Sequence, residues 1–355
     1  MKNNDRMTIK NHFPAEWEKH EATWIGWPHN KSDWPGKFTP IIWVYCEIVK
    51  KISQGEKVRI IVEDKTHQQK AIRALQDSDV DLHNVEFYIL RTDRGWTRDS
   101  GPIFVKSKVS GEVILIPFKF NAWAKYDNYK KDVRFPDFIS KKIQLKSVKP
   151  IHKNSHVVLE GGSIDSNGNG LLLTTEECLL DPKVQVRNPG FTKEDYEQVF
   201  RKYLGIEQVI WLNKGIAGDD THGHVDDLCR FVNKETVVLV QEENPKDANY
   251  KKLKENKEIL KSIRLNNKSK LEVIDLPMPS PVIFKGQRLP ASYANFYICN
   301  SHVIVPTFND VKDREALGIL GELFSDRIVV GIHAVDLVWG LGTLHCLTHE
   351  QPLKG

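Results

Sequence analysis

The stretch Gly223-His-Val-Asp-Asp-Leu-Cys-Arg-Phe-Val232 decides the fold, because in it a small-residue turn leads directly into a strand-like run. Four further segments, residues 100–105, 161–164, 291–298 and 342–346, repeat this pattern of a glycine or small-residue turn followed by such a run. The segments recur at intervals of roughly 50–70 residues, which is compatible with one supersecondary unit per repeat, as in a propeller. A ring of such units would bring the polar residues beside their turns to one central site.

Between these segments, helical and strand patterns alternate along the chain. Apolar spacing predicts helices over residues 40–52, 66–75, 192–204, 247–263 and 310–324. Short apolar runs predict strands over residues 57–62, 85–90, 236–240 and 327–331. Thr192 and Asp195 are spaced as in a capping box, and Gly205 ends that helical pattern. The class is therefore α/β, and the repetition favours a ring over a layered sheet.

Composition excludes several classes of protein. The 355 residues are enough to bury a large core without disulfides, and a net charge of +4 is small for this size. The five cysteines are odd in number and never form C-x-x-C, which indicates free thiols in a reducing cytoplasm. Glutamates interrupt the lysines of residues 250–270, as on a solvated helix face. Apolar runs are too short for a signal peptide or a membrane span. We expect a cytoplasmic protein that binds neither nucleic acid nor membrane.

Two acidic residues stand beside tight turns. In Trp96-Thr-Arg-Asp-Ser-Gly-Pro102, Asp99 comes just before a Gly-Pro break, and loops on a rigid scaffold commonly carry function. Taken alone, Asp99 is also explained by a purely structural role, in which it pairs with Arg98 or caps a turn. In Leu159-Glu-Gly-Gly-Ser163, Glu160 follows an apolar run, and a buried glutamate needs a partner. We expect Glu160 to face a cation, a histidine or a substrate, with a satisfied structural glutamate as the alternative.

The most polar cluster is Gly218-Asp-Asp-Thr-His-Gly-His-Val-Asp-Asp227. In an extended segment, side chains alternate with period two, so His222, His224 and Asp226 would point to the same side. Two kinds of chemistry fit that face. The three side chains could bind a divalent metal, as in a metal-dependent amidohydrolase, or one histidine could act as general acid and base while the aspartate holds a cation.

Near the C-terminus, Cys346 follows the glycine-rich turn of Trp339-Gly-Leu-Gly-Thr-Leu-His-Cys. Backbone N–H groups of such a turn can stabilise a thiolate or a tetrahedral adduct. A single cysteine is usually a small buried hydrophobic residue, and this is the role we expect for the other four. Those four are Cys46, Cys178, Cys229 and Cys299. Cys346 differs because polar residues flank it, and it is the candidate nucleophile.

Five ordered blocks of this sequence resemble the agmatine deiminase family, which also contains bacterial peptidylarginine deiminase-like proteins. The blocks are Phe13-Pro-Ala-Glu-Trp-Glu with Trp27-Pro-His-Asn, Trp96-Thr-Arg-Asp-Ser-Gly-Pro, Leu159-Glu-Gly-Gly-Ser, Gly218-Asp-Asp-Thr-His-Gly-His-Val-Asp, and Gly340-Leu-Gly-Thr-Leu-His-Cys. The resemblance implies the pentein fold, a five-bladed α/β propeller of ββαβ-type repeats around a central active site. Residues 13–355 would form a single deiminase catalytic domain after an N-terminal extension of residues 1–12.

The resemblance also implies roles for individual residues. The catalytic cysteine falls on Cys346 and the catalytic histidine on His224. The residues expected to bind substrate are Asp99, Asp226, Glu160 and Trp96. In this mechanism the thiolate attacks a guanidinium carbon, the histidine protonates departing ammonia, and water hydrolyses the covalent thiouronium intermediate. No metal and no cofactor is required.

Agmatine, converted to N-carbamoylputrescine in putrescine biosynthesis and polyamine metabolism, is the expected substrate. Arginine and peptidylarginine are the competing substrates. The aromatic and acidic stretch of Trp24, Trp27, Asp33 and Trp34 favours agmatine if it reaches the pocket. The alternatives outside this class are a metal-dependent amidohydrolase that uses His222, His224 and Asp226, and a family member that only binds its ligand.

Two positions depart from the family pattern. His349 stands where relatives usually have glutamine, and Ser100 replaces a larger residue. The departures affect the expected substrate more than the reaction type. The resemblance also suggests a homodimer.

Overall fold

Three sheets of the protein share one plan, in which a helix connects two parallel strands and a short strand pairs antiparallel with the first of them. The computed structural model describes residues 10–266 and 268–355. The strands of these sheets are β10 (Asp165–Ser166), β11 (Leu171–Thr175) and β12 (Gln208–Leu212); β13 (Cys229–Phe231), β14 (Thr236–Gln241) and β15 (Glu272–Pro277); and β18 (Tyr297–Ile298), β19 (His302–Thr307) and β20 (Ile328–His333). The connecting helices include α5 (Glu176–Leu180), α6 (Lys193–Val199), α7 (Tyr250–Ser262) and α8 (Asp313–Leu323). Each sheet is thus a ββαβ unit.

Two four-stranded sheets extend the same plan. In one, β1 (Asn11–His12), β5 (Ile103–Ser107) and β6 (Val113–Ile116) are antiparallel, and α4 (Phe135–Lys142) leads to the parallel strand β7 (Lys146–Ser147). In the other, β21 (Thr348–Pro352) pairs antiparallel with β2 (His20–Gly26), which continues through α1 (Phe38–Ile52) to β3 (Lys57–Val62) and through α2 (Lys65–Asp77) to β4 (Val85–Ile89). Two hairpins, β8 (Ile151–His152) with β9 (Ser155–His156) and β16 (Ile283–Phe284) with β17 (Gln287–Arg288), complete the sheets of the described residues.

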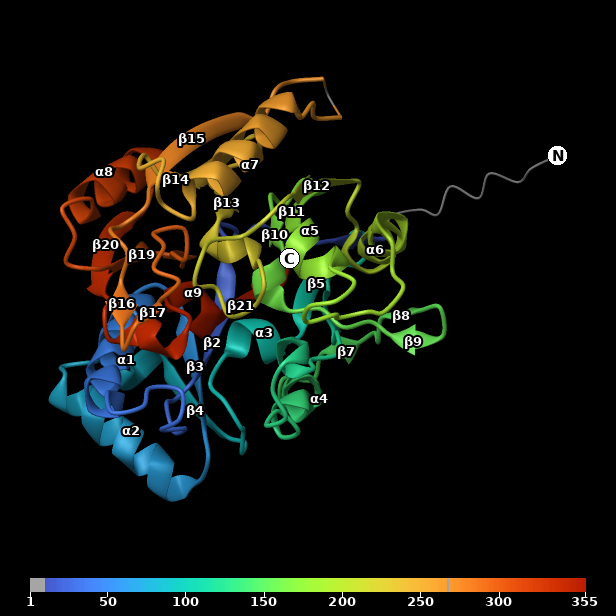
Figure 1. Ribbon diagram of the computed structural model, residues 1–355. Helices are drawn as coiled ribbons and strands as arrows, with labels where there is room; N and C mark the ends of the chain where they lie inside the picture. The colour runs from blue at the N-terminus through green and yellow to red at the C-terminus, as the bar shows by residue number, and fades with distance from the viewer. Residues whose placement is uncertain (1–9, 267) are drawn as a thin grey trace.

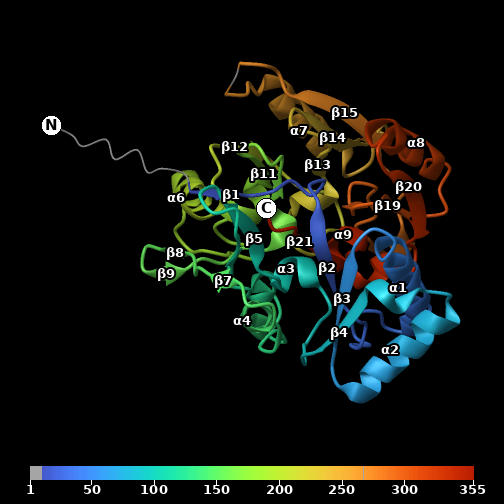
Figure 2. The same ribbon diagram turned by 180° about the vertical axis from the view of Figure 1, so that it is seen from behind.

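The two ends of the chain therefore meet in one sheet. In Figure 1 the units follow one another around the molecule in chain order, from the blue N-terminal part to the red C-terminal part. Figure 2 shows β21 beside β2 from behind. Cys346 lies just before β21, so its position depends on the pairing of β21 with β2 near the other end of the chain.

Apolar strand sequences match their burial. β11 is entirely buried and β14 almost entirely, and the helices α5 and α7 pack against them. Strands buried on both faces have continuous rather than alternating apolar sequences, as in Thr-Val-Val-Leu-Val of β14. All five cysteines lie in the described part of the chain, and all are buried and free, so the prediction of no disulfide framework is confirmed.

Most predicted elements are confirmed, with shifts of a few residues at their ends. The helix expected over residues 192–204 is α6 followed by one wider π-helical turn, Phe200–Leu204, and it ends at Gly205 in the left-handed conformation. The capping box of Thr192 and Asp195 is present. Of the predicted extension at residues 1–12, residues 1–9 lie outside the described residues and residues 11–12 form β1. None of the described helices is both long and apolar enough to cross a bilayer.

The strand-like run predicted within residues 223–232 is confirmed only in part, and the extended conformation assumed for residues 222–226 is wrong. Val225–Asp227 forms a 3₁₀ turn, and only Cys229–Phe231 is a strand. Residues 342–346 likewise enter a short helix, α9 (Leu344–Leu347), before β21 begins. In both places one helical turn directs a polar side chain into the buried centre, where Asp226 of the first turn bonds His345 of the second at 2.7 Å.

Candidate active site

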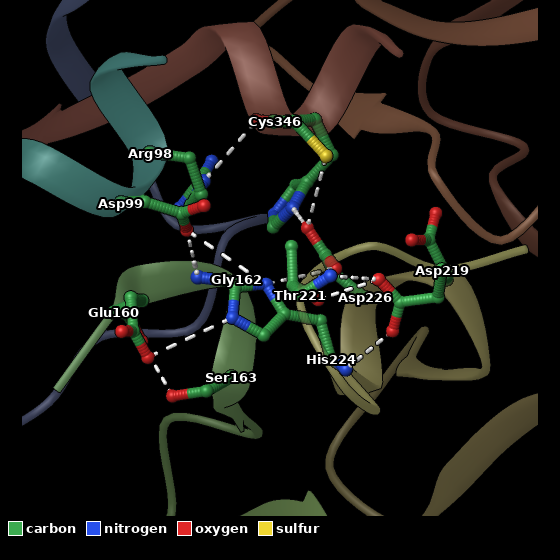
Figure 3. A network of polar contacts seen from close by, with 12 residues as sticks. Arg98, Asp99, Glu160, Gly162, Ser163, Asp219, Thr221, His224, Asp226 and Cys346 are labelled. Atoms are coloured by element: carbon green, nitrogen blue, oxygen red, sulfur yellow. Dashed lines mark hydrogen bonds and ion pairs between the residues drawn. The ribbon is translucent and has the colours of Figure 1, made fainter. Parts of the chain in front are cut away.

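Short turns from several units bring the polar residues of the motifs together at the centre of the molecule (Figure 3). Asp99 lies on α3 (Thr97–Ser100), Glu160 precedes the 3₁₀ turn Gly161–Ser163, and His224 precedes the 3₁₀ turn that carries Asp226. Cys346 lies on α9. All five side chains are buried. The structure thus brings together the five acidic, histidine and cysteine residues that the sequence singled out.

Gly162 allows these side chains to approach one another. A Cβ atom at this position would lie 2.6 Å from Nδ1 of His224, 2.9 Å from Oδ1 of Asp99 and 3.0 Å from Oδ2 of Asp226. The backbone N–H of Gly162 also donates to Oδ1 of Asp99 at 3.0 Å. Only glycine fits here without displacing the polar groups.

His224 is surrounded by carboxylates without a short contact to any of them. Its Nδ1 lies 3.9 Å from Asp99 and 3.9 Å from Asp226, and its Nε2 lies 3.7 Å from Glu160. Neither ring nitrogen has a hydrogen-bond partner among the described residues. Burial alone would lower the pKa of His224, but the charge of Asp99 and the other acidic neighbours raises it well above its usual value. The imidazole can therefore hold a proton close to all three carboxylates.

Asp99 is not the structural partner of Arg98. Its Oδ2 accepts from the indole N–H of Trp123 at 2.8 Å, whereas the Arg98 guanidinium reaches Glu16 and Glu350. Burial raises the pKa of Asp99, and the charges of Asp226 and Glu160 raise it further. The charge of His224 lowers this pKa but does not offset the effect of burial. This carboxylate is therefore poorly compensated, and a cation in the site would stabilise its ionised form.

Glu160 has the partners that the sequence predicted, a cation and a histidine. The Nε of Arg187 lies 3.2 and 3.3 Å from its two carboxylate oxygens, and both side chains are fully buried. Burial opposes ionisation, but Arg187 and His224 lower the pKa of Glu160 to about 2. Glu160 is therefore a fixed anion that faces Nε2 of His224.

Asp226 is anchored at one oxygen only. Its Oδ2 accepts from Nδ1 of His345 at 2.7 Å, whereas its Oδ1 has no hydrogen-bond partner among the described residues. Burial would raise the pKa of Asp226, but His345 and, less strongly, His224 keep it below its usual value. Asp226 is thus an ionised carboxylate with one oxygen available to a ligand.

Cys346 lies at the end of a pocket whose lining includes Trp96, Asp99 and Trp123. The thiol is 7% exposed, and its Sγ lies 3.2 Å from the amide nitrogen of Asn295 and 3.7 Å from Oδ2 of Asp226. Burial and the nearby carboxylates raise the pKa of Cys346 well above its usual value. Without a ligand, Cys346 is therefore a thiol rather than a thiolate at neutral pH. Trp96, predicted to bind substrate, lies in the lining of the same pocket as Cys346.

His222 does not join this group, and the predicted common face of His222, His224 and Asp226 is wrong. The backbone of His222 has a φ of 66°, and its Nε2 bonds Asp181 at 2.9 Å. Among the described residues, the one group within metal-ligand spacing is Glu160, Cys178 and His224, and Arg187 already neutralises Glu160. The left-handed backbone of His222 and Gly223, with φ of 66° and 94°, breaks the alternation of an extended segment before the turn at residues 225–227 begins.

The aromatic stretch of residues 24–34 does not reach the pocket lining. Trp24 is fully buried against Tyr88 and Phe135, and Asp33 instead pairs with Arg94, its carboxylate 3.1 Å from the guanidinium. The stretch acts on the pocket only indirectly, through Arg94 and the contact of Trp34 with Trp96.

The two departures from the family pattern have structural roles. His349 donates from Nε2 to the carbonyl of Pro102 at 2.7 Å, and burial lowers its pKa to about 4. Ser100 donates to the carbonyl of Trp96 at 3.1 Å. Neither residue lies in the lining of the Cys346 pocket.

Sequence reasoning missed several residues that shape the site. Asn295 contacts Cys346 and also accepts from the Thr343 hydroxyl at 2.6 Å. Asp219 accepts from the backbone N–H of His224 at 2.9 Å. Cys178 is buried as expected, but beside Glu160 and His224 rather than in a purely apolar environment. Asn295 and Asp219 are polar residues within segments that the sequence singled out, so they could have been predicted as site residues. No feature of the sequence around Cys178 indicated its position.

Comparisons with known proteins agree with this geometry. The family model of the Porphyromonas-type peptidyl-arginine deiminases matches residues 12–352. An agmatine deiminase of Ectopseudomonas mendocina is 34% identical over 96% of this chain and 95% of its own length. The solved agmatine deiminase of Enterococcus faecalis superposes with a TM-score of 0.88 at 29% identity, over 98% of this chain and 97% of that one. A substrate-bound agmatine deiminase of C. jejuni gives a TM-score of 0.85 at 30% identity, over 97% of each chain.

Proposed function

Since the chain belongs to the Porphyromonas-type peptidyl-arginine deiminase family, we propose that it hydrolyses the guanidinium group of agmatine to N-carbamoylputrescine and ammonia. The observation that carries this proposal is the arrangement around Gly162. There a buried thiol, a histidine and two incompletely paired carboxylates, Asp99 and Asp226, face one small space. A planar cation with several N–H donors matches these groups in charge and in hydrogen bonding.

Asp99 and Asp226 would hold the guanidinium and keep it charged. Carboxylates bind N–H groups of a planar guanidinium in a fork geometry. Oδ1 of Asp226 has no partner, and Asp99 has only the N–H of Gly162 and the indole N–H of Trp123. Keeping the substrate protonated makes its central carbon more open to attack.

Entry of the cation would also activate Cys346. Two of the carboxylates that raise the pKa of the thiol, Asp226 and Asp99, are those that the substrate would neutralise, so binding favours the thiolate. His224 takes up the thiol proton as Sγ forms a bond to the guanidinium carbon. His224 then protonates the departing nitrogen, which leaves as ammonia from a covalent thiouronium.

Hydrolysis would complete the cycle. His224, having given up a proton, deprotonates a water molecule that attacks the same carbon, and the C–S bond breaks to return Cys346 and a ureido product. Glu160 remains ionised through both steps because of Arg187, and it supports the charged form of His224. One agmatine and one water give one N-carbamoylputrescine and one ammonia.

The outer part of the pocket supports an ammonium rather than a carboxylate at the far end of the substrate. The lining includes the aromatic rings of Trp96, Trp123 and Tyr126, and the carboxylate of Asp220, which already pairs with Lys125 and accepts from the Tyr126 hydroxyl at 2.6 Å. Aromatic faces and carboxylates attract an ammonium. The one arginine of the lining, Arg94, is already paired with Asp33 and stacked over the Tyr126 ring at 4.3 Å, so it offers little charge to an arginine carboxylate.

We further propose that the five larger sheets are the blades of a five-bladed propeller within one catalytic domain of residues 13–355. The shared ββαβ order and the pairing of β21 with β2 support this arrangement. Free, buried thiols also favour a reducing compartment such as the cytoplasm.

The test is a panel assay of ammonia release from agmatine, arginine, arginine peptides and dimethylarginine, with Cys346→Ala as the blank. We expect agmatine to give the highest kcat/KM and the Cys346→Ala protein to give no turnover. A higher kcat/KM for arginine or a peptide would contradict the choice of substrate. Activity that survives in Cys346→Ala but is lost with a chelator would contradict the cysteine mechanism.

A further inference from the structure

A buried group of charges lies behind Asp226 and takes no part in the mechanism above. It consists of Glu16, from the Phe13-Pro-Ala-Glu-Trp-Glu block, together with His345, Arg98 and Arg230. All four side chains are buried. Burying charges is costly unless they are paired, so their place directly behind a substrate-facing carboxylate needs an explanation.

His345 connects this group to the site. Its Nδ1 lies 2.7 Å from Oδ2 of Asp226, and its Nε2 lies 2.8 Å from Oε2 of Glu16. An ionised carboxylate only accepts hydrogen bonds, so both ring nitrogens must donate. An imidazole that donates from both nitrogens is the imidazolium cation. The geometry therefore places a positive charge directly behind Asp226.

Glu16 is held as an anion by several donors. Arg230 lies 3.0 Å and Arg98 lies 3.3 Å from its oxygens, and the backbone N–H of Ile298 donates to it at 2.8 Å. Burial opposes its ionisation, but Arg230 and His345 keep the pKa of Glu16 well below the usual value. A carboxylate fixed in this way also fixes the ring of His345.

We propose that His345, oriented by Glu16, is a positioning residue for deimination. Its cation occupies Oδ2 of Asp226 and leaves Oδ1 directed at the substrate. It also keeps Asp226 ionised close to two other buried acids, Asp99 and Asp227, and to the thiol of Cys346. The inference rests on the proposed function, because it assigns His345 a role through the guanidinium-binding carboxylate.

The pairing sets a pH dependence for substrate binding. The groups that face Asp226 are His345 and Cys346 from α9, Arg230 from β13, Asp99 from α3 and, within its own segment, His224 and Asp227. Without His345, burial and the neighbouring acids dominate, and Asp226 takes up a proton at higher pH. A protonated Asp226 no longer attracts the guanidinium charge, so the acidic limit of binding moves upward.

The test compares His345→Gln with His349→Gln. Both histidines are buried in the same C-terminal segment, but His349 contacts only the carbonyl of Pro102 among hydrogen-bond partners and lies outside the pocket lining. We expect His345→Gln to lower kcat/KM for agmatine by roughly 10- to 100-fold, the loss typical when the residue that orients a metal-binding side chain is removed, because His345 orients Asp226 in the same way. His349→Gln should stay within threefold of the unchanged enzyme.

Binding is measured separately by titrating agmatine into the same variants in a Cys346→Ala background, where no turnover occurs. His345→Gln should weaken binding and move its acidic limit to higher pH, which a purely structural role would not do. If a folded His345→Gln protein binds agmatine with unchanged affinity and with the same acidic limit of binding, the inference is overturned.

Glu16→Gln provides a second variant if His345→Gln does not fold. The glutamine oxygen still accepts from Nε2, but the compensating charge is lost, so a smaller loss in the same direction is expected. An unchanged kcat/KM in folded Glu16→Gln would remove Glu16 from the proposal. Failure of the proposed function is recognised separately, because the unchanged enzyme would then not release ammonia from agmatine.

Discussion

Replacing Gly162 by alanine places one methyl group where three functional side chains meet. The new Cβ would lie 2.6 Å from Nδ1 of His224, about 0.8 Å closer than ordinary van der Waals contact at 3.4 Å. The carboxylates of Asp99 and Asp226 would be 2.9 and 3.0 Å away. None of these is the free end of a long exposed side chain, so His224 or the backbone of the turn must move.

The size of the effect follows from that displacement. A misplacement of about 1 Å in a catalytic arrangement can reduce the rate by about 10²-fold, which corresponds to about 2.7 kcal/mol in the activation free energy. Overpacking a buried site costs a further ~1–3 kcal/mol in the free energy of unfolding. We therefore expect Gly162→Ala to lower kcat/KM about 100-fold and to reduce stability measurably.

The assay is ammonia release from agmatine, together with urea unfolding of the same preparation. Gly321→Ala is the matched control, because Gly321 lies in α8 with no atom within 4 Å of the added Cβ. It should keep full activity and gain about 0.5–1 kcal/mol of stability, as alanine is the better helix former. Gly162→Ala with kcat/KM within threefold of the unchanged enzyme would refute the crowded geometry around His224.

Two further predictions concern titratable groups. Burial raises the pKa of Asp132 to about 7, and because this exceeds the unfolded value, its contribution to stability is present below about pH 4 and lost as the pH rises through 7. The free energy of unfolding measured with urea should therefore fall by about 2–4 kcal/mol between pH 4 and pH 8, and it should fall by less in Asp132→Asn. Identical pH profiles for the two proteins would contradict the prediction. For Cys346, whose pKa is raised by burial and acidic neighbours, iodoacetamide labelling of the free enzyme should accelerate continuously from pH 7 to 9.5. Labelling is followed at Cys346 by mass spectrometry. A labelling rate that reaches a plateau below pH 8 would contradict the prediction that Cys346 is a thiol in the free enzyme.

Local features of the fold could be predicted because they depend on neighbouring residues. The strand Lys57–Val62 has the predicted ends, and the capping box of Thr192 and Asp195 forms as its spacing indicates. Both depend on the pattern of a few consecutive residues. The extended conformation assumed for residues 222–226 fails for the opposite reason. Its conformation is set by the buried centre that it enters, not by its own sequence pattern.

The sequence by itself determined which residue types meet at the site, since the motifs carry Asp99, Glu160, His224, Asp226 and Cys346 in order. Only the tertiary structure decided how these residues are paired. It directs His222 to Asp181, and it joins His345 to Glu16, 329 residues earlier in the chain. The physical reason is that spacing along the chain fixes local geometry, whereas the partner of a buried charge is chosen by whichever distant segment packs against it.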